Sequence, residues 1–154
     1  DMPSANPAPI RALGEITIRC ADWPAMRRFY EEIIGLPVLE VFEETGICFF
    51  EIAPGYGGHT CVLALFAAEA VTRDVHPSGG PRPKAGPSST LHHLALTVDY
   101  DRQDALCAFL KERDVAFTVE HFDWIGWRGV FVRDPEGNTV EFVAGGHKPA
   151  ALPT

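Results

Sequence analysis

The sequence has few cysteines, and no two of them are spaced as a metal or redox pair. Its 154 residues include 4 cysteines, and none of them forms a C-x-x-C motif. Zinc-thiolate sites are built from such pairs, so the sequence gives no support for one. Three of the cysteines stand in apolar, strand-like runs. We therefore expect reduced, mostly buried thiols and a cytoplasmic protein. The four are Cys20, Cys48, Cys61 and Cys107.

Long apolar runs and an excess of positive charge are also missing. No run approaches the ~20 apolar residues that a membrane-spanning helix needs. Asp1–Arg11 is rich in proline and alanine without an apolar core, so we expect a flexible lead-in and not a secretory signal. The formal net charge of −8 argues against nucleic acid or an anionic membrane as partner. With 46% apolar and 22% charged residues the chain is typical of a globular protein, for which we expect a small-molecule partner.

What the sequence does contain is one βαβββ pattern, present twice. In the first copy, Leu13–Cys20 alternates apolar and polar residues as a half-buried strand does. An amphipathic helix follows, which we expect to begin after Asp22 and to end at Gly35. Three more strands are expected in this copy, at Val38–Phe42, Ile47–Ile52 and Thr60–Phe66.

The second copy begins with another alternating strand, Leu91–Val98. Asp99 or Asp101 is expected to cap the helix that follows. A tight turn is predicted at Asp134–Asn138, because its proline sets φ and its glycine supplies a left-handed position. The remaining strands are expected at Val115–Val119, Gly129–Val132 and Thr139–Val143.

The stretch between the two copies is rich in proline and glycine, as linkers are. At about 20 residues it is long for a loop inside a compact domain. We expect it to be exposed and flexible, because it cannot bury enough apolar surface to order itself. The predicted organisation is a first module at 13–70, a linker at 71–90, a second module at 91–145, and flexible tails at 1–12 and 146–154.

Aligning the two copies brings together residues that can bind a metal. Glu15 matches His93 in the first strand of each copy, and Glu141 matches Ala64 in the last strand. All of them have the parity opposite to the apolar residues of their strands, so they occupy the polar face. Each alone has an ordinary alternative, such as a solvated Glu15 or a structural His93. Glu141, however, lies in the apolar run TVEFVA, where a carboxylate needs a cation or several donors to offset its desolvation.

The repeated plan and three stretches of the chain resemble the vicinal oxygen chelate superfamily, which includes glyoxalase I, bleomycin-resistance proteins and extradiol dioxygenases. The stretches are RFYEEIIGLPV (28–38), LHHLALTV (91–98) and FVRDPEGNTVEF (131–142), within about Leu13–Gly145. The ending D-P-x-G-N-x-x-E is the most specific. The resemblance implies an α+β fold in which two βαβββ modules curl their sheets around a metal-lined cleft, within one chain or between two. It also implies a homodimer.

The same resemblance implies a ligand set. Residues of the first and last strands bind a divalent metal, which the substrate chelates through two adjacent oxygens. The matching positions here are Glu15, His93 and Glu141, with Ala64 leaving a fourth position vacant. The family most often has His where this chain has Glu15. This harder set favours Fe(II), with Mn(II), Ni(II) and Zn(II) as alternatives, and three facial ligands leave open positions for substrate and dioxygen.

Further candidate residues follow from the dioxygenase signature. It places a His and then a Tyr before D-P-x-G. In this chain His121 lies somewhat further upstream, and Phe131 stands at the Tyr position. His121 is a candidate general base beside the catalytic candidate Glu141, with a solvated loop histidine as the alternative. Arg19 or Arg128 would suit a substrate carboxylate. Candidate substrate-binding residues, with ordinary packing as the alternative, are Phe49, Tyr56, His59, Trp124, Trp127, Arg128 and Phe131.

Three classes of function are therefore compatible with the sequence. The first choice is an extradiol-dioxygenase-like oxygenase with Fe(II). The second is a glyoxalase- or epimerase-like lyase or isomerase, in which the metal stabilises an enediolate. The third is a metal-free small-molecule-binding protein of the bleomycin-resistance type. The three ligand-type residues argue against the third class, because a binding protein does not need them.

Overall fold

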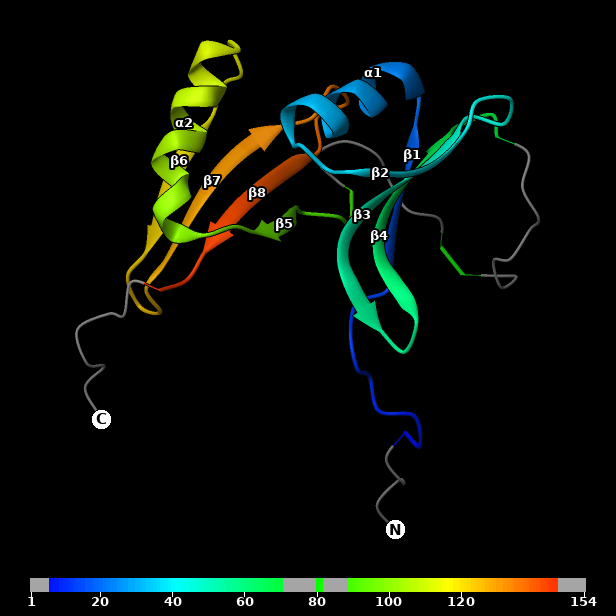
Figure 1. The fold of residues 1–154 in the computed structure, drawn as a ribbon, viewed down its shortest axis with the longest axis horizontal. Helices are drawn as coiled ribbons and strands as arrows, with labels where there is room; N and C mark the ends of the chain where they lie inside the picture. Colours follow the sequence, from blue (N-terminus) through cyan, green and yellow to red (C-terminus); the bar gives the residue numbers. More distant parts are fainter. Residues whose placement is uncertain (1–5, 71–79, 82–88, 147–154) are drawn as a thin grey trace. The chain divides into compact units, whose positions relative to one another are not determined.

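The computed structural model describes residues 6–70, 80–81 and 89–146. The chain divides into two compact units, Asp1–Arg73 and Asp74–Thr154. Each unit carries one four-stranded sheet, as Figure 1 shows. The predicted α+β class with two βαβββ modules is confirmed. Most of the predicted linker at 71–90 lies outside the described residues, as do the outer parts of both tails. Within the described ranges, no helix is long and apolar enough to cross a membrane.

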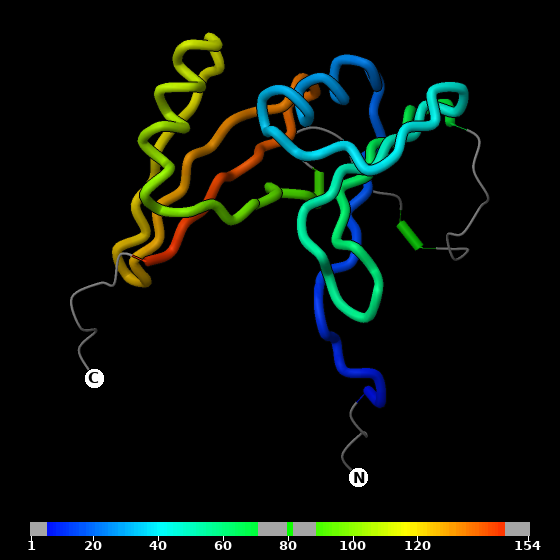
Figure 2. Tube along the Cα trace, viewed as in Figure 1, coloured from blue at the N-terminus to red at the C-terminus, as the bar shows by residue number. Residues whose placement is uncertain are grey.

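The first unit has the strand order β1-β4-β3-β2. Strand β1 runs parallel to β4, and the other pairs are antiparallel. The tube in Figure 2 follows the chain through this sheet and around the β3–β4 hairpin. Its elements are β1 (Glu15–Cys20), α1 (Trp23–Arg28), a π-helix (Phe29–Ile33), β2 (Val38–Phe42), β3 (Ile47–Tyr56) and β4 (His59–Ala67).

The helix of this unit begins and ends where the sequence predicts. The Asp22 carboxylate accepts a hydrogen bond of 3.1 Å from the backbone N–H of Ala25, which satisfies one donor of the first turn. Gly35 has a φ of 82°, the left-handed conformation that ends helices. Between these ends the helix widens into its π-helical turn, and Tyr30 there is fully buried. The helix thus packs one face into the core of the unit.

The second unit repeats the plan, with the strand order β5-β8-β7-β6. Helix α2 lies along one face of this sheet (Figure 1). The buried Gln103 at its start donates from Nε2 to two sheet carbonyls, Arg128 O at 2.8 Å and Phe142 O at 3.1 Å. The elements are β5 (Leu94–Thr97), a 3₁₀ turn (Tyr100–Arg102), α2 (Gln103–Glu112), β6 (Thr118–Phe122), β7 (Trp127–Arg133) and β8 (Thr139–Ala144).

Two predictions for this unit are wrong in detail. Neither the 3₁₀ turn nor α2 has a side-chain cap, so Asp99 and Asp101 do not cap the helix. The 3₁₀ turn precedes α2 instead, and Gln103 anchors its start. Strand β6 begins at Thr118 and not at Val115. The reason is that Val115 N still donates to Leu110 O at 2.9 Å to close the helix, after Asp114 has adopted a φ of 54°.

The predicted turn at Asp134–Asn138 forms and sets the pairing of β7 with β8. The Asp134 carboxylate accepts hydrogen bonds of 2.9 Å from the backbone N–H groups of Glu136 and Asn138, and one of 2.8 Å from the Asn138 side chain. Gly137 takes the left-handed position, with a φ of 86°. A turn held this firmly fixes the register of the strands it joins, which sets Phe131 opposite Glu141.

Candidate functional site

A histidine and a glutamate face each other on the second sheet. Glu141 lies in the middle of β8, and its side chain points away from the face that carries Val140 and Phe142. The residue is only 5% exposed. His93 directly precedes β5, the strand paired with β8. Its Nε2 lies 3.2 Å from Glu141 Oε1, so a nitrogen and an oxygen donor share one small volume.

Two residues of β7 shape the surroundings of this pair. Phe131 stands opposite Glu141 in the sheet, and its ring meets the His93 ring edge to face at 6.1 Å between centroids. Gly129 leaves the space that the carboxylate needs. A Cβ at Gly129 would overlap Glu141 Oε2 and would lie 2.8 Å from Phe131 Cε2. Sequence reasoning missed this glycine, although a lone glycine within a strand is a known sign of a close approach.

A second histidine lies beside the first. The Nδ1 atoms of His92 and His93 lie 2.8 Å apart. This is a hydrogen-bonding distance. The sequence analysis also gave His92 no role. The sign of it in the sequence is that it stands directly beside the candidate ligand His93.

Burial dominates the electrostatics of Glu141. It raises the pKa of the Glu141 carboxyl, while the neighbouring His93 and its hydrogen bond lower that pKa by less. The folded protein therefore holds this carboxylate at a cost that a bound cation would offset.

Replacing Glu141 with Gln is expected to stabilise the metal-free protein at neutral pH. Because the folded pKa is raised, the folded state binds the proton more tightly than the unfolded state. The resulting stability is present below the unfolded pKa and is lost as pH rises through the folded pKa. The Gln variant carries no charge to desolvate and loses this pH dependence. Urea unfolding with a chelator, from about pH 4 to pH 8, measures it. Parallel stability curves for both proteins would contradict the expectation.

The His93–Glu141 pair fits two neighbouring ligands of one divalent metal. Ligands bound at about 2.0–2.2 Å from an ion and at near right angles stand about 3 Å apart, close to the observed separation. Imidazole and carboxylate together suit Fe(II), Mn(II), Ni(II) or Zn(II). Among the described residues, no group of three or more His, Cys, Asp or Glu side chains gathers as a metal site. Within the second unit, the two candidate ligands His93 and Glu141 come together.

The strand registers confirm that the two units are equivalent around this position. In the first unit Thr17 pairs with Ala64, and in the second unit Ala95 pairs with Glu141. Two residues upstream of Thr17 and Ala95 lie Glu15 and His93, so these two are equivalent as well. Ala64 is fully buried. The exposed Glu15 accepts a hydrogen bond of 3.2 Å at Oε2 from the Thr17 hydroxyl.

Phe49 is the counterpart of Phe131, since it pairs with Ala64 as Phe131 pairs with Glu141. Its ring packs edge to face against Phe42 and Phe66, at 6.4 Å and 6.1 Å between centroids. The first sheet therefore carries a row of aromatic rings on the face of Glu15. Arg19 lies on this face too, because it alternates with Glu15 along β1.

Tyr56 and His59 lie together at the end of the β3–β4 hairpin, where they pair in register. Tyr56 is 53% exposed, and the guanidinium of Arg11 lies 4.6 Å from its ring centroid. The His59 ring lies against Gly14, where an added Cβ would stand 3.4 Å from its Cε1. His59 is thus beside the residue that precedes Glu15.

His121 and Arg128 do not join the His93–Glu141 pair. They pair with each other across β6 and β7, on the face opposite Gly129 and Phe131. Helix α2 covers this face, and Arg128 Nη2 lies 2.7 Å from Oδ1 of Asp104 at its start. The strand register therefore places both on the sheet face opposite Gly129 and Phe131.

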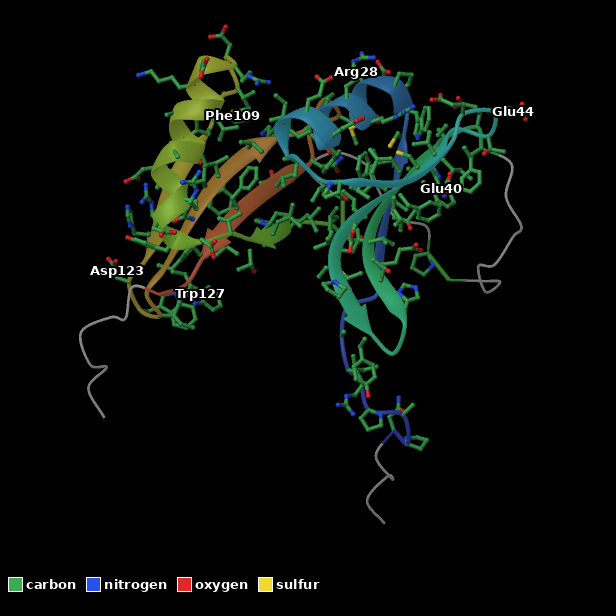
Figure 3. All side chains as sticks on the ribbon, in the orientation of Figure 1. Arg28, Glu40, Glu44, Phe109, Asp123 and Trp127 are labelled. Atoms are coloured by element: carbon green, nitrogen blue, oxygen red, sulfur yellow. The ribbon has the colours of Figure 1, made fainter. Side chains whose placement is uncertain are left out.

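Trp127 alternates with Gly129 and Phe131 and so shares their face of the sheet. Figure 3 shows Trp127 and Asp123 at the same end of the second unit, where β6 turns into β7. Trp124 lies in that turn, and the centroids of the two indole rings are 6.2 Å apart. Both are well exposed, at 65% for Trp124 and 45% for Trp127.

Comparison with protein families identifies the fold. The model of the Glyoxalase/Bleomycin resistance protein/Dioxygenase superfamily matches residues 12–142. The chain belongs to this superfamily. Glyoxalase-superfamily proteins commonly use divalent metals, bind small molecules and often form dimers. Comparison with curated protein sequences gave no match.

Solved structures of the glyoxalase superfamily are similar over nearly the whole chain. A glyoxalase/dioxygenase from Nostoc punctiforme is 26% identical, with a TM-score of 0.60 over 93% of this chain and 97% of its own. A lactoylglutathione lyase from Agrobacterium tumefaciens is 23% identical, with a TM-score of 0.63 over 90% and 96%. A glyoxalase/bleomycin resistance protein/dioxygenase from Nocardioides is 20% identical, with a TM-score of 0.61 over 95% and 92%.

Proposed function

We propose that this protein is a divalent-metal enzyme whose substrate chelates the metal through two adjacent oxygens. Glu15, His93 and Glu141 are the proposed protein ligands. The observation that carries the proposal is the separation of 3.2 Å between His93 Nε2 and Glu141 Oε1, with the carboxylate buried in the space left by Gly129. Glu15 is included because the strand registers make it the equivalent of His93.

For the reaction, we propose an oxygenase that acts on a catechol-like diol with Fe(II). Three ligands, with Ala64 at the fourth position, leave room for two substrate oxygens and dioxygen. When bound, Fe(II) would polarise the substrate oxygens and supply electrons to dioxygen. Phe131 and Trp127 lie on the same sheet face as Glu141 and would pack against an aromatic ring. A cytoplasmic homodimer is part of the same proposal.

A lyase or isomerase is the second candidate, and the burial of Glu141 favours it. A carboxyl with a raised pKa is suited to taking a proton from the carbon beside a carbonyl. The likeness to a lactoylglutathione lyase is compatible with this chemistry.

Oxygen consumption separates the two candidates. Protein loaded with Fe(II) without oxygen is expected to take up oxygen when a catechol is added, with the ring-cleaved product appearing in step. Glu141→Ala protein, treated identically, is expected to lose at least about 100-fold in rate, because it lacks a metal ligand. The solvent-exposed Glu112 at the end of α2 gives a matched control, and Glu112→Ala should behave as the wild type.

The second candidate predicts a different result. A lyase or isomerase would turn over a hemithioacetal or an acyl thioester without oxygen, would work with Ni(II) or Mn(II), and would carry solvent deuterium into the carbon beside the carbonyl. That outcome would reject the oxygenase and keep the metal site. Tight substrate binding that is indifferent to metal would favour the binding-protein class instead.

A further inference from the structure

His92 and His93 form an imidazole pair that the proposed metal site does not by itself explain. Their Nδ1 atoms lie 2.8 Å apart, and the rings meet at 75°. The other nitrogen of His93, Nε2, faces Glu141 Oε1 at 3.2 Å. His93 is therefore contacted at both ring nitrogens, by an imidazole on one side and a carboxylate on the other.

The hydrogen bond between the two rings has a direction that depends on their tautomers. A neutral imidazole has one N–H donor and one acceptor nitrogen. At a separation of 2.8 Å, one Nδ1 donates and the other accepts.

A metal at His93 Nε2 sets the direction of this hydrogen bond. Nε2 must then offer its lone pair, so the proton of His93 lies on Nδ1, which is the donor. Metal-binding histidines almost always donate this second N–H to a partner that fixes the ring. In this chain the group within reach of that N–H is Nδ1 of His92.

We propose that His92 is a positioning residue, whose Nδ1 accepts a hydrogen bond from Nδ1 of His93 and so orients Nε2 of His93 toward the metal. The inference rests on the proposed metal site. Imidazole suits this role because its unprotonated nitrogen is an acceptor.

Two substitutions separate hydrogen bonding from packing. His92→Phe keeps a planar ring but neither donates nor accepts. His92→Asn keeps both functions, because its amide can turn either its oxygen or its nitrogen toward His93. Loss of such an outer partner typically weakens metal binding about 10- to 100-fold. We expect that loss in the Phe variant and less than about a threefold change in the Asn variant, with Zn(II) as the probe in calorimetric titrations.

Nitrogen NMR of the histidine rings tests this positioning without any activity measurement. In wild-type protein loaded with Zn(II), His93 is expected to carry its proton on Nδ1, with Nδ1 of His92 as the acceptor. Thermal unfolding of each variant confirms that it is folded. The inference is overturned if, with Zn(II) bound, Nδ1 of His92 carries the proton between the two rings. It is also overturned if His92→Phe binds Zn(II) as tightly as the wild type, or if Phe and Asn weaken binding equally.

One further variant separates this inference from the proposed function. If His93→Ala loses Zn(II) while His92→Phe retains it, the metal site stands and the role of His92 is rejected. If His93→Ala binds Zn(II) like the wild type, the metal site itself is rejected, and the inference falls with it.

Discussion

Replacing either His93 or Glu141 with alanine is expected to remove most of the divalent metal that the protein carries. Each substitution deletes one donor of the pair separated by 3.2 Å. Losing an outer-sphere partner costs about 10- to 100-fold in metal affinity, so losing a direct ligand should cost about 100-fold or more. The two variants should differ in stability. Glu141→Ala removes a buried carboxylate, whereas His93→Ala leaves that carboxylate buried without its neighbour and should be the less stable in metal-free form.

The measurement is elemental analysis of protein purified without chelators, followed by titration of the metal-free protein with Fe(II) in the absence of oxygen. Wild type should carry about one equivalent per chain, as a three-ligand site would. Glu15→Ala tests the third proposed ligand and should also lower the metal content. Glu112→Ala removes an exposed carboxylate of the second unit and should leave it unchanged. Unaltered metal content in both His93→Ala and Glu141→Ala would rule out the proposed site.

The parts of the fold that follow from short-range rules could be predicted from the sequence. Alternation assigned the faces of the strands, and the Asp134–Asn138 turn could be predicted from its proline and glycine. Together they place Glu141 on the polar face of β8, opposite Phe131. The equivalence of Glu15 with His93 also followed from the repeat, and the strand registers agree with it.

His121 shows what such rules leave open. His121 was assigned as a candidate base from its distance along the chain to the D-P-x-G turn. That distance does not say which face of the sheet its side chain occupies. In the structure β6 begins at Thr118, and its register pairs His121 with Arg128 on the face opposite Gly129 and Phe131. A shift of one residue along a strand exchanges its two faces, so sequence distance alone cannot assign a side chain to a site.

The sequence contains a sign of Gly129 and of His92 but does not assign their roles, because these depend on side-chain contacts that only the structure shows. Gly129 has no side chain whose chemistry could be read. Its importance lies in the Glu141 carboxylate that β8 brings against it. His92 became relevant once the ring nitrogens were located, since adjacent residues of an extended strand normally point to opposite faces.

Gly129→Ala is expected to disturb the site without removing any ligand. The added Cβ would overlap Glu141 Oε2 and would lie 2.8 Å from Phe131 Cε2, so the carboxylate must move. Overpacking of this kind costs about 1–3 kcal/mol of stability. Displacing the carboxylate should weaken metal binding by roughly 10- to 100-fold, the range found when the support of a ligand is lost. The glycine is needed for space and not for its backbone conformation, because it is absent from the residues with positive φ.

A double-mutant cycle with Glu141→Ala isolates the cause. If the new methyl group overlaps the Glu141 carboxylate, Gly129→Ala should destabilise the Glu141→Ala protein less than it destabilises the wild type. The difference between the two costs, which is the coupling free energy, should be about 0.5–3 kcal/mol. Gly145→Ala is the matched control, because its Cβ would meet Trp127 at an ordinary 3.5 Å. Urea unfolding of metal-free protein and titration with Zn(II) measure the two effects. Additive costs in the cycle, with wild-type metal affinity in Gly129→Ala, would show that Glu141 does not depend on the space beside Gly129.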